Sequence, residues 1–199
     1  MRLFGISLGL GNAKIGDAFS FSLPSIQTCP GASKWCKRHC YAYRYEKRRP
    51  TCRSAYELNL AKTADLDEFV RVMVGTIPRI VPAFRIHVGG DFHSVEYVRA
   101  WTRIAASFPQ VRFWAYTRSW AAPDLLPALE ELRDLPNVEL FASCDQTMPL
   151  PPAGWRIAFI DTDPRARGLA CPQQEGSLPD CLACTYCFKR GGHVIFKTH

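Results

Sequence analysis

Short apolar runs separated by longer amphipathic stretches dominate the middle of the chain. Residues 19–23 alternate apolar and polar positions, which predicts a first strand. Each later run is short, rich in β-branched or aromatic residues, and bounded by residues that favour turns. These runs predict strands at 84–88, 111–116, 138–142, 156–160 and 194–196.

The amphipathic stretches between these runs carry helix-start signals. Asp65 and Ser94 are predicted N-caps, and the second of these helices runs through Phe108. Ser54 followed by Glu57 has the spacing of a capping box and predicts another helix start. A further helix is expected over 123–135.

Strands that alternate with helices indicate an α/β fold with a parallel sheet and right-handed crossovers. Five or six strands are too few for a full eight-stranded barrel. We therefore expect a partial (β/α)6, TIM-like barrel with its core at about 19–160, and an open doubly wound sheet is the alternative. The 199 residues fit one domain that ends in a segment at about 161–199.

The N-terminal run from Leu3 to Leu10 is interrupted by glycines, and no small-residue cleavage site follows it. We interpret it as an ordinary first strand and not as a signal peptide. No apolar run approaches the roughly 20 residues that span a bilayer. We expect a cytoplasmic protein without a membrane partner. The 12% aromatic content excludes an intrinsically disordered chain.

Nine cysteines are many for such a chain, and four of them lie near the C-terminus. Clustered thiols in a protein of this size indicate metal binding more than disulfides. The two-residue gaps in this set resemble a ferredoxin run, and four thiolates suffice for one [4Fe–4S] cluster. Zinc is the alternative. The set comprises Cys171, Cys181, Cys184 and Cys187.

Three more cysteines, Cys29, Cys36 and Cys40, occupy a loop after the predicted first strand. Three thiolates can hold three irons of a second [4Fe–4S] cluster, which leaves the fourth iron open to a substrate or cofactor. A zinc site that includes His39 is the alternative.

Polar residues that follow the strands are the candidates for ligand binding, because ligands of parallel sheets bind at the carboxyl ends of the strands. Arg118 can bind a carboxylate or phosphate through two hydrogen bonds. Asp91 and His93 are candidates for an acid–base pair, with helix capping by Asp91 as the alternative. Cys144 is a candidate reactive thiol, a fourth ligand of the N-terminal cluster, or a small core residue.

The net charge of +7 indicates an anionic partner. Basic residues interleave with Tyr41, Tyr43 and Tyr45 over 37–53, a pattern that suits nucleic acid. The alternative is a solvated loop whose cations offset an anionic cluster beside it.

Segments 28–42, 85–94, 113–120 and 143–145, together with Cys181-x2-Cys184-x2-Cys187, resemble the phage "gene product 88" family. The resemblance spans nearly the whole chain and implies a phage protein. It implies no particular reaction.

More distantly, the layout resembles radical S-adenosylmethionine (SAM) enzymes. Those carry a three-cysteine loop after the first barrel strand and a Gly-Gly-Glu-like motif after the second. Gly89, Gly90 and Asp91 stand at the matching place, whereas Tyr43 stands where the usual spacing would put a third cysteine. This resemblance implies SAM as a cofactor, bound near Gly89, Gly90 and Asp91.

Two functions follow from these features. The first is a protein with two [4Fe–4S] clusters that catalyses a redox or radical-SAM-like reaction, with a small-molecule substrate and an electron donor as partners. The second is a module that binds nucleic acid or a partner protein, in which the clusters, or zinc, are structural.

Overall fold

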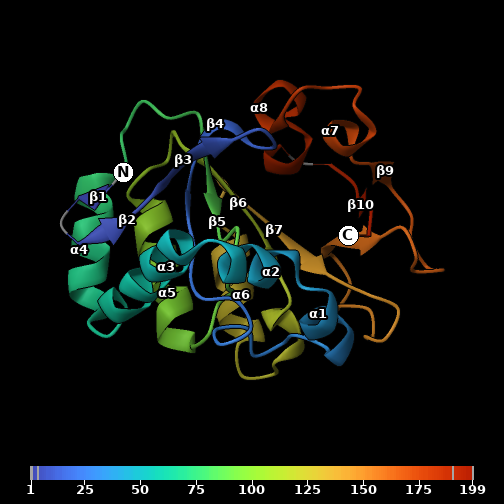
Figure 1. Cartoon of the computed structure of the whole chain (residues 1–199), viewed down its shortest axis with the longest axis horizontal. Coiled ribbons are helices and arrows are strands. Elements are labelled where there is room, and N and C mark those ends of the chain that lie inside the picture. Colours follow the sequence, from blue (N-terminus) through green and yellow to red (C-terminus); the bar gives the residue numbers. More distant parts are fainter. Residues whose placement is uncertain (1, 4, 190, 199) are drawn as a thin grey trace.

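A computed structural model describes residues 2–3, 5–189 and 191–198. Its centre is an eight-stranded sheet in which only the first pair, β3 and β4, is antiparallel (Figure 1). The strand order is β3-β4-β5-β6-β7-β8-β10-β9. The strands are β3 (Gly9–Asn12), β4 (Gly16–Phe21), β5 (Ala83–Ile86), β6 (Arg112–Thr117), β7 (Val138–Ser143), β8 (Arg156–Ile160), β9 (Leu169–Ala170) and β10 (Val194–Phe196).

The predicted α/β architecture with a mostly parallel sheet is confirmed. The predicted number of five or six strands is wrong, because the sheet has eight among the described residues. Two short edge strands, β3 and β9, are added to the six strands predicted from residue 19 onward, and β3 begins inside the N-terminal run from Leu3 to Leu10. The sheet is open, since no pairing joins these edges among the described residues. From β4 to β8 the strands are neighbours in the order in which they occur in the chain, as in a barrel and unlike a doubly wound sheet.

Helices α4 (Leu66–Thr76), α5 (Val95–Ala106) and α6 (Leu126–Arg133) pack on one face of this sheet. Asp65 and Ser94 cap the first two of these helices as predicted. Every second strand residue faces them, and the core between is rich in aromatic rings. Its largest fully buried side chains include Phe21, Phe69, Phe84, Tyr97 and Trp101.

The opposite face carries a second apolar cluster that includes Trp114, Phe141 and Phe188. The chain after β8 covers this face, and Figure 1 shows it in orange and red. This segment adds α7 (Pro172–Glu175), α8 (Cys181–Cys184) and the 3-10 helix η2 (Tyr186–Phe188).

The connection from β4 to β5 holds the N-terminal cysteines and three helices before α4: α1 (Lys34–His39), α2 (Tyr41–Arg48) and α3 (Pro50–Lys62). The basic stretch 37–53 is therefore mainly helical, and its interpretation as a loop is wrong. The predicted start at Ser54 is wrong too: α3 begins at Pro50, whose fixed φ suits the first helical position.

The N-terminal run is not one strand. It forms a hairpin of β1 (Arg2–Leu3) and β2 (Ile6–Ser7) that turns at Gly5, followed by β3. The Asn59 amide on α3 holds β2, because it accepts from the Ser7 N–H at 2.8 Å and donates to the Ser7 carbonyl at 2.9 Å. None of the described helices is long and apolar enough to cross a membrane.

Candidate metal and ligand site

A cavity of about 210 Å³ lies beside the carboxyl ends of the central strands. Cys29, Cys36 and Cys40 all line it. The glycines and polar residues predicted at the strand ends lie in the same wall, so the structure brings most of the predicted site together. These residues are Gly89, Gly90, Asp91 and Arg118.

Local helix geometry positions the three cysteines. Ser33 caps α1, and its hydroxyl accepts from the Cys36 N–H at 2.9 Å. Cys40 lies between α1 and α2 and caps α2, with its sulfur accepting from the Tyr43 N–H at 3.4 Å.

The three thiols are close enough to influence one another. Burial raises the pKa of Cys29 far above its usual range, and Asp91, Cys36 and Cys40 raise it further. Burial raises the pKa of Cys36 to about 11, although the Arg118 charge opposes this shift. Both thiols are therefore protonated at neutral pH, and a metal that binds them must displace their protons.

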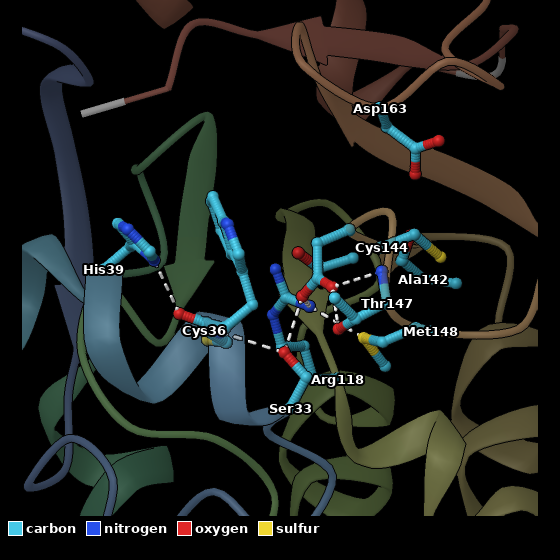
Figure 2. Close-up of polar contacts among 12 residues, drawn as sticks. Ser33, Cys36, His39, Arg118, Ala142, Cys144, Thr147, Met148 and Asp163 are labelled. Carbon is cyan, nitrogen blue, oxygen red and sulfur yellow. Dashed lines mark hydrogen bonds and ion pairs between the residues drawn. The ribbon is translucent and has the colours of Figure 1, made fainter.

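A buried ion pair anchors the cysteine loop to β6 and β7 (Figure 2). Asp145 accepts from the Arg118 guanidinium at 2.5 Å and from the Ser33 hydroxyl at 2.7 Å. Burial opposes ionisation of Asp145, but hydrogen bonds from Ser33 and Thr147, with the Arg118 charge, lower its pKa below the usual range. Arg118 is thus occupied by a carboxylate of the protein.

The cysteine loop also touches the backbone after β6. A Cβ on Gly31 would lie 1.8 Å from the Arg118 carbonyl oxygen, so only glycine allows this approach.

Asp91 is buried, and its carboxylate organises the strand ends. It accepts from the Thr117 hydroxyl at 2.6 Å and from the backbone N–H groups of Phe92 at 2.8 Å and Arg118 at 2.7 Å. Burial raises the pKa of Asp91 even though these hydrogen bonds oppose the shift. Its oxygens already have protein partners, which fits a positioning role beside the cavity.

Two predicted catalytic residues do not line the cavity. His93 stacks on Tyr97 with ring centroids 4.4 Å apart, so the structure does not assemble it with Asp91 in one pocket. Cys144 is fully buried in the helix-side core, and its N–H donates to the Ala158 carbonyl at 3.0 Å. Burial raises the pKa of Cys144 to about 12, as is typical of an unreactive core thiol.

The C-terminal cysteines lie on the face of the sheet opposite α4, α5 and α6. Cys171, Cys181 and Cys187 are buried in one apolar cluster, and Cys184 is partly exposed. Backbone hydrogen bonds fix two of them, from Cys171 to the Ile195 carbonyl and from Cys181 to the Lys14 carbonyl, both at 2.9 Å. Burial raises the pKa of Cys187 to about 11. Among the residues that the structure describes, no three Cys, His, Asp or Glu side chains are arranged to hold a single metal ion.

Two cations that sequence reasoning missed, Lys14 and Arg85, lie between the two cysteine sets. Both line the cavity, and both interact electrostatically with Cys181. Arg85 carries a charge and is nevertheless only 7% exposed, because all four residues of β5 are buried. Its position between Phe84 and Ile86 in an otherwise apolar run was the available signal, since a buried arginine requires a partner.

The basic residues of α1 to α3 form an exposed surface with tyrosines. Tyr41 and Tyr45 are 46% and 49% exposed. The Lys47 ammonium lies 4.7 Å from the centroid of the Tyr43 ring, and the Arg49 guanidinium lies 4.9 Å from that of Tyr45. Tyr41 also lines the cavity, so this surface adjoins its mouth.

Comparison with known proteins relates the chain to phage proteins. It is 33% identical to the gene 88 protein of Mycobacterium phage L5 and 34% identical to that of Mycobacterium phage D29. Each match covers 94% of this chain and 90% of the phage protein. No solved structure matches the chain. The pattern of the gene product 88 family matches residues 7–190, and the chain therefore belongs to that family.

Proposed function

We propose that this chain is an iron–sulfur protein with two [4Fe–4S] clusters, one of which faces a small-molecule substrate. The observation that carries the proposal is that Cys29, Cys36 and Cys40 line one cavity. Three thiolates leave one iron of a cubane without a protein ligand, and here that position would face the cavity. Such an iron supplies a place for a substrate or for SAM to coordinate.

Charge supports a cluster at the C-terminal set. A cubane core held by four thiolates carries about −2 overall. Burial of that charge requires compensating cations, and Lys14 interacts with Cys171, Cys181 and Cys187. The Tyr116 hydroxyl also interacts with the Cys187 sulfur, and hydrogen bonds to cysteine sulfurs are among the factors that set cluster potentials.

The two sites have different parts in the proposed reaction. No cysteine of the C-terminal set lines the cavity, so this set suits electron transfer or structure. Around the cavity, the chain's own residues bind and orient. Asp91 fixes the ends of β5 and β6, and Asp145 fixes the cysteine loop through Ser33.

Metal analysis of protein purified without oxygen tests this function. We expect about eight irons and eight acid-labile sulfides per chain, because two cubanes hold that number. Cys40→Ala should remove the iron of the cavity set alone, and Cys184→Ala should affect the C-terminal set. Zinc without sulfide would overturn the proposal.

Electron paramagnetic resonance tests the radical-SAM-like form of the reaction. If SAM binds at the cavity, adding it to the reduced protein changes the spectrum, and the Cys40→Ala variant loses this response. An unchanged spectrum in the protein with both clusters would restrict the reaction to other redox chemistry.

A second candidate function is nucleic-acid binding by the basic surface of α1 to α3. The observation that favours it is the exposure of three tyrosines among lysines and arginines. Affinity for single-stranded DNA or RNA should fall steeply with salt. Absence of retention on both polymers at low salt would eliminate this function, in which the clusters or zinc would be structural.

A further inference from the structure

We infer that the cavity binds a small oxyanion, a carboxylate or phosphate group of its ligand, through the guanidinium of Arg85. This inference deepens the proposed function, on which it rests for the role of that ligand as substrate. It names the chemical class of the molecule that would meet the N-terminal cysteine set. The binding step itself depends on residues outside that set and is measured separately from iron.

The guanidinium of Arg85 has an incomplete set of partners. Its Nε donates to the His87 carbonyl at 3.2 Å, and its plane lies over the Tyr116 ring with the central carbon 4.5 Å from the ring centroid. No other hydrogen bond and no carboxylate ion pair of Arg85 occurs within 2–3, 5–189 and 191–198. The two terminal nitrogens are therefore left for a ligand in the cavity that Arg85 lines.

Among the described residues that line the cavity, Asp91 is the acidic one, and its carboxylate is already committed to other groups. It accepts from the Thr117 hydroxyl and from the N–H groups of Phe92 and Arg118. Cys181 also interacts electrostatically with Arg85. A buried guanidinium whose terminal nitrogens have no acceptor is costly, so an oxyanion that accepts from Arg85 stabilises the folded state.

Lys14 adds a second positive charge to the same cavity. Its ammonium lies 4.7 Å from the centroid of the Phe196 ring, and it also interacts electrostatically with Arg85 and with the C-terminal cysteines. Ala158, Ile160 and Phe196 supply apolar surface around the two cations. Such surroundings strengthen an ion pair because they exclude water.

The arrangement also limits the kind of anion. The planar fork of an arginine matches two oxygens of a carboxylate or a phosphate, and Tyr116 holds that fork in one orientation. The cavity volume of about 210 Å³ lies below the roughly 300–1,000 Å³ of pockets for drug-sized ligands. The ligand is therefore a small metabolite with an acidic group at Arg85 and its remaining part toward the cysteines.

Isothermal titration with inorganic phosphate and, separately, with acetate tests the inference on anaerobically purified protein of known iron content. We expect binding of at least one probe, and the preferred probe identifies the acidic group. Arg85→Gln should weaken binding at least tenfold, and Lys14→Gln should weaken it by a smaller factor. Arg48→Gln is the matched control, because Arg48 is an exposed cation of α2 outside the cavity.

If Arg85→Gln fails to fold, Arg85→Lys keeps the charge without the fork, and weaker binding by this variant supports the same site. No binding of either probe to iron-loaded protein would overturn the inference and leave the proposed clusters intact. Equal binding by Arg85→Gln, or loss of binding in Arg48→Gln, would also overturn it. Binding to protein that holds no iron supports the anion site and counts against the proposed function alone.

Discussion

The two cysteine sets use the same side chain in opposite environments. Cys29, Cys36 and Cys40 are partly exposed at a cavity, and a polar network around Asp145 holds their loop. The C-terminal set packs against Trp114 and Phe188, and backbone hydrogen bonds to the sheet position two of its members.

The N-terminal cysteines are therefore accessible to a ligand in the cavity, whereas the C-terminal cysteines are mostly shielded from solvent. Partly exposed loops tolerate exchange of ligands, because few apolar contacts are lost when they move. A metal cluster held by the buried cysteines would contribute to folding, because these cysteines also form the core over that face. Four predictions test this contrast, from the largest expected effect to the smallest.

Substitution in the buried set should cause the largest loss of stability. Cys181→Ser places a hydroxyl in an apolar cluster and removes a proposed cluster ligand, so we expect a loss of about 3 kcal/mol and a fall in Tm of about 6–12 °C. Cys40→Ser at the cavity should cost less than about 1 kcal/mol. Anaerobic thermal melts measure both, and equal shifts would contradict the contrast.

Loss of Asp145, which holds the loop of the N-terminal cysteines, should lower the free energy of unfolding nearly as much. Asp145→Asn leaves the buried Arg118 without its counter-charge, so we expect a loss of about 3 kcal/mol in urea unfolding. Glu57→Gln removes an exposed ion pair with Arg53 and should change stability by no more than about 0.5 kcal/mol. If Asp145→Asn behaved like this control, the anchor would lie elsewhere.

Acid should weaken the packing at the end of β5, where His87 lies beside the cavity. Burial, with the charges of His93 and Arg85, lowers the pKa of His87 to about 3. The unfolded chain protonates this imidazole near pH 6.5 and the folded one does not. The contribution of His87 to the free energy of unfolding therefore falls by about 2 kcal/mol from neutral pH to pH 5. His87→Asn tolerates the positive φ of 62° and should flatten this dependence in denaturant titrations. A profile as steep as that of the parent would exclude His87 as the source.

The smallest effect is expected for Cys144→Ala. This change removes one buried sulfur from the helix-side core and should cost about 1 kcal/mol without loss of iron. Iron loss in this variant would identify Cys144 as a ligand of the cavity cluster. That cluster would then have four cysteine ligands and no open iron.

Most of the sheet was predictable because its strands carry their own signals. β8 and β10 match their predicted runs at both ends, since each is a short apolar stretch bounded by turn residues. The edge strand β9 has two exposed residues, Leu169 and Ala170, and exists only because β10 pairs with it. Strands of this kind depend on tertiary contacts that no local pattern reports.

The candidate site was partly predictable for a similar reason. Spacing grouped the cysteines, and the strand ends placed Gly89, Gly90 and Asp91 beside them. Side-chain alternation also carried information about Cys144, because it lies two positions after Ala142 and faces the same core. Lys14 could not be assigned to the cavity, because its place depends on how α8 packs on the turn between β3 and β4.

The position of β10 also bears on biosynthesis. This strand lies between β8 and β9, and its Ile195 carbonyl fixes Cys171. In a ribosome-bound chain that has not yet extruded residues 194–196, the strands from β4 to β8 can pair. Strand β9 cannot, because its partner β10 is missing. Assembly of the C-terminal cysteine set must therefore wait until translation has passed this strand, whereas the cavity cysteines can be in position while the chain is still being made.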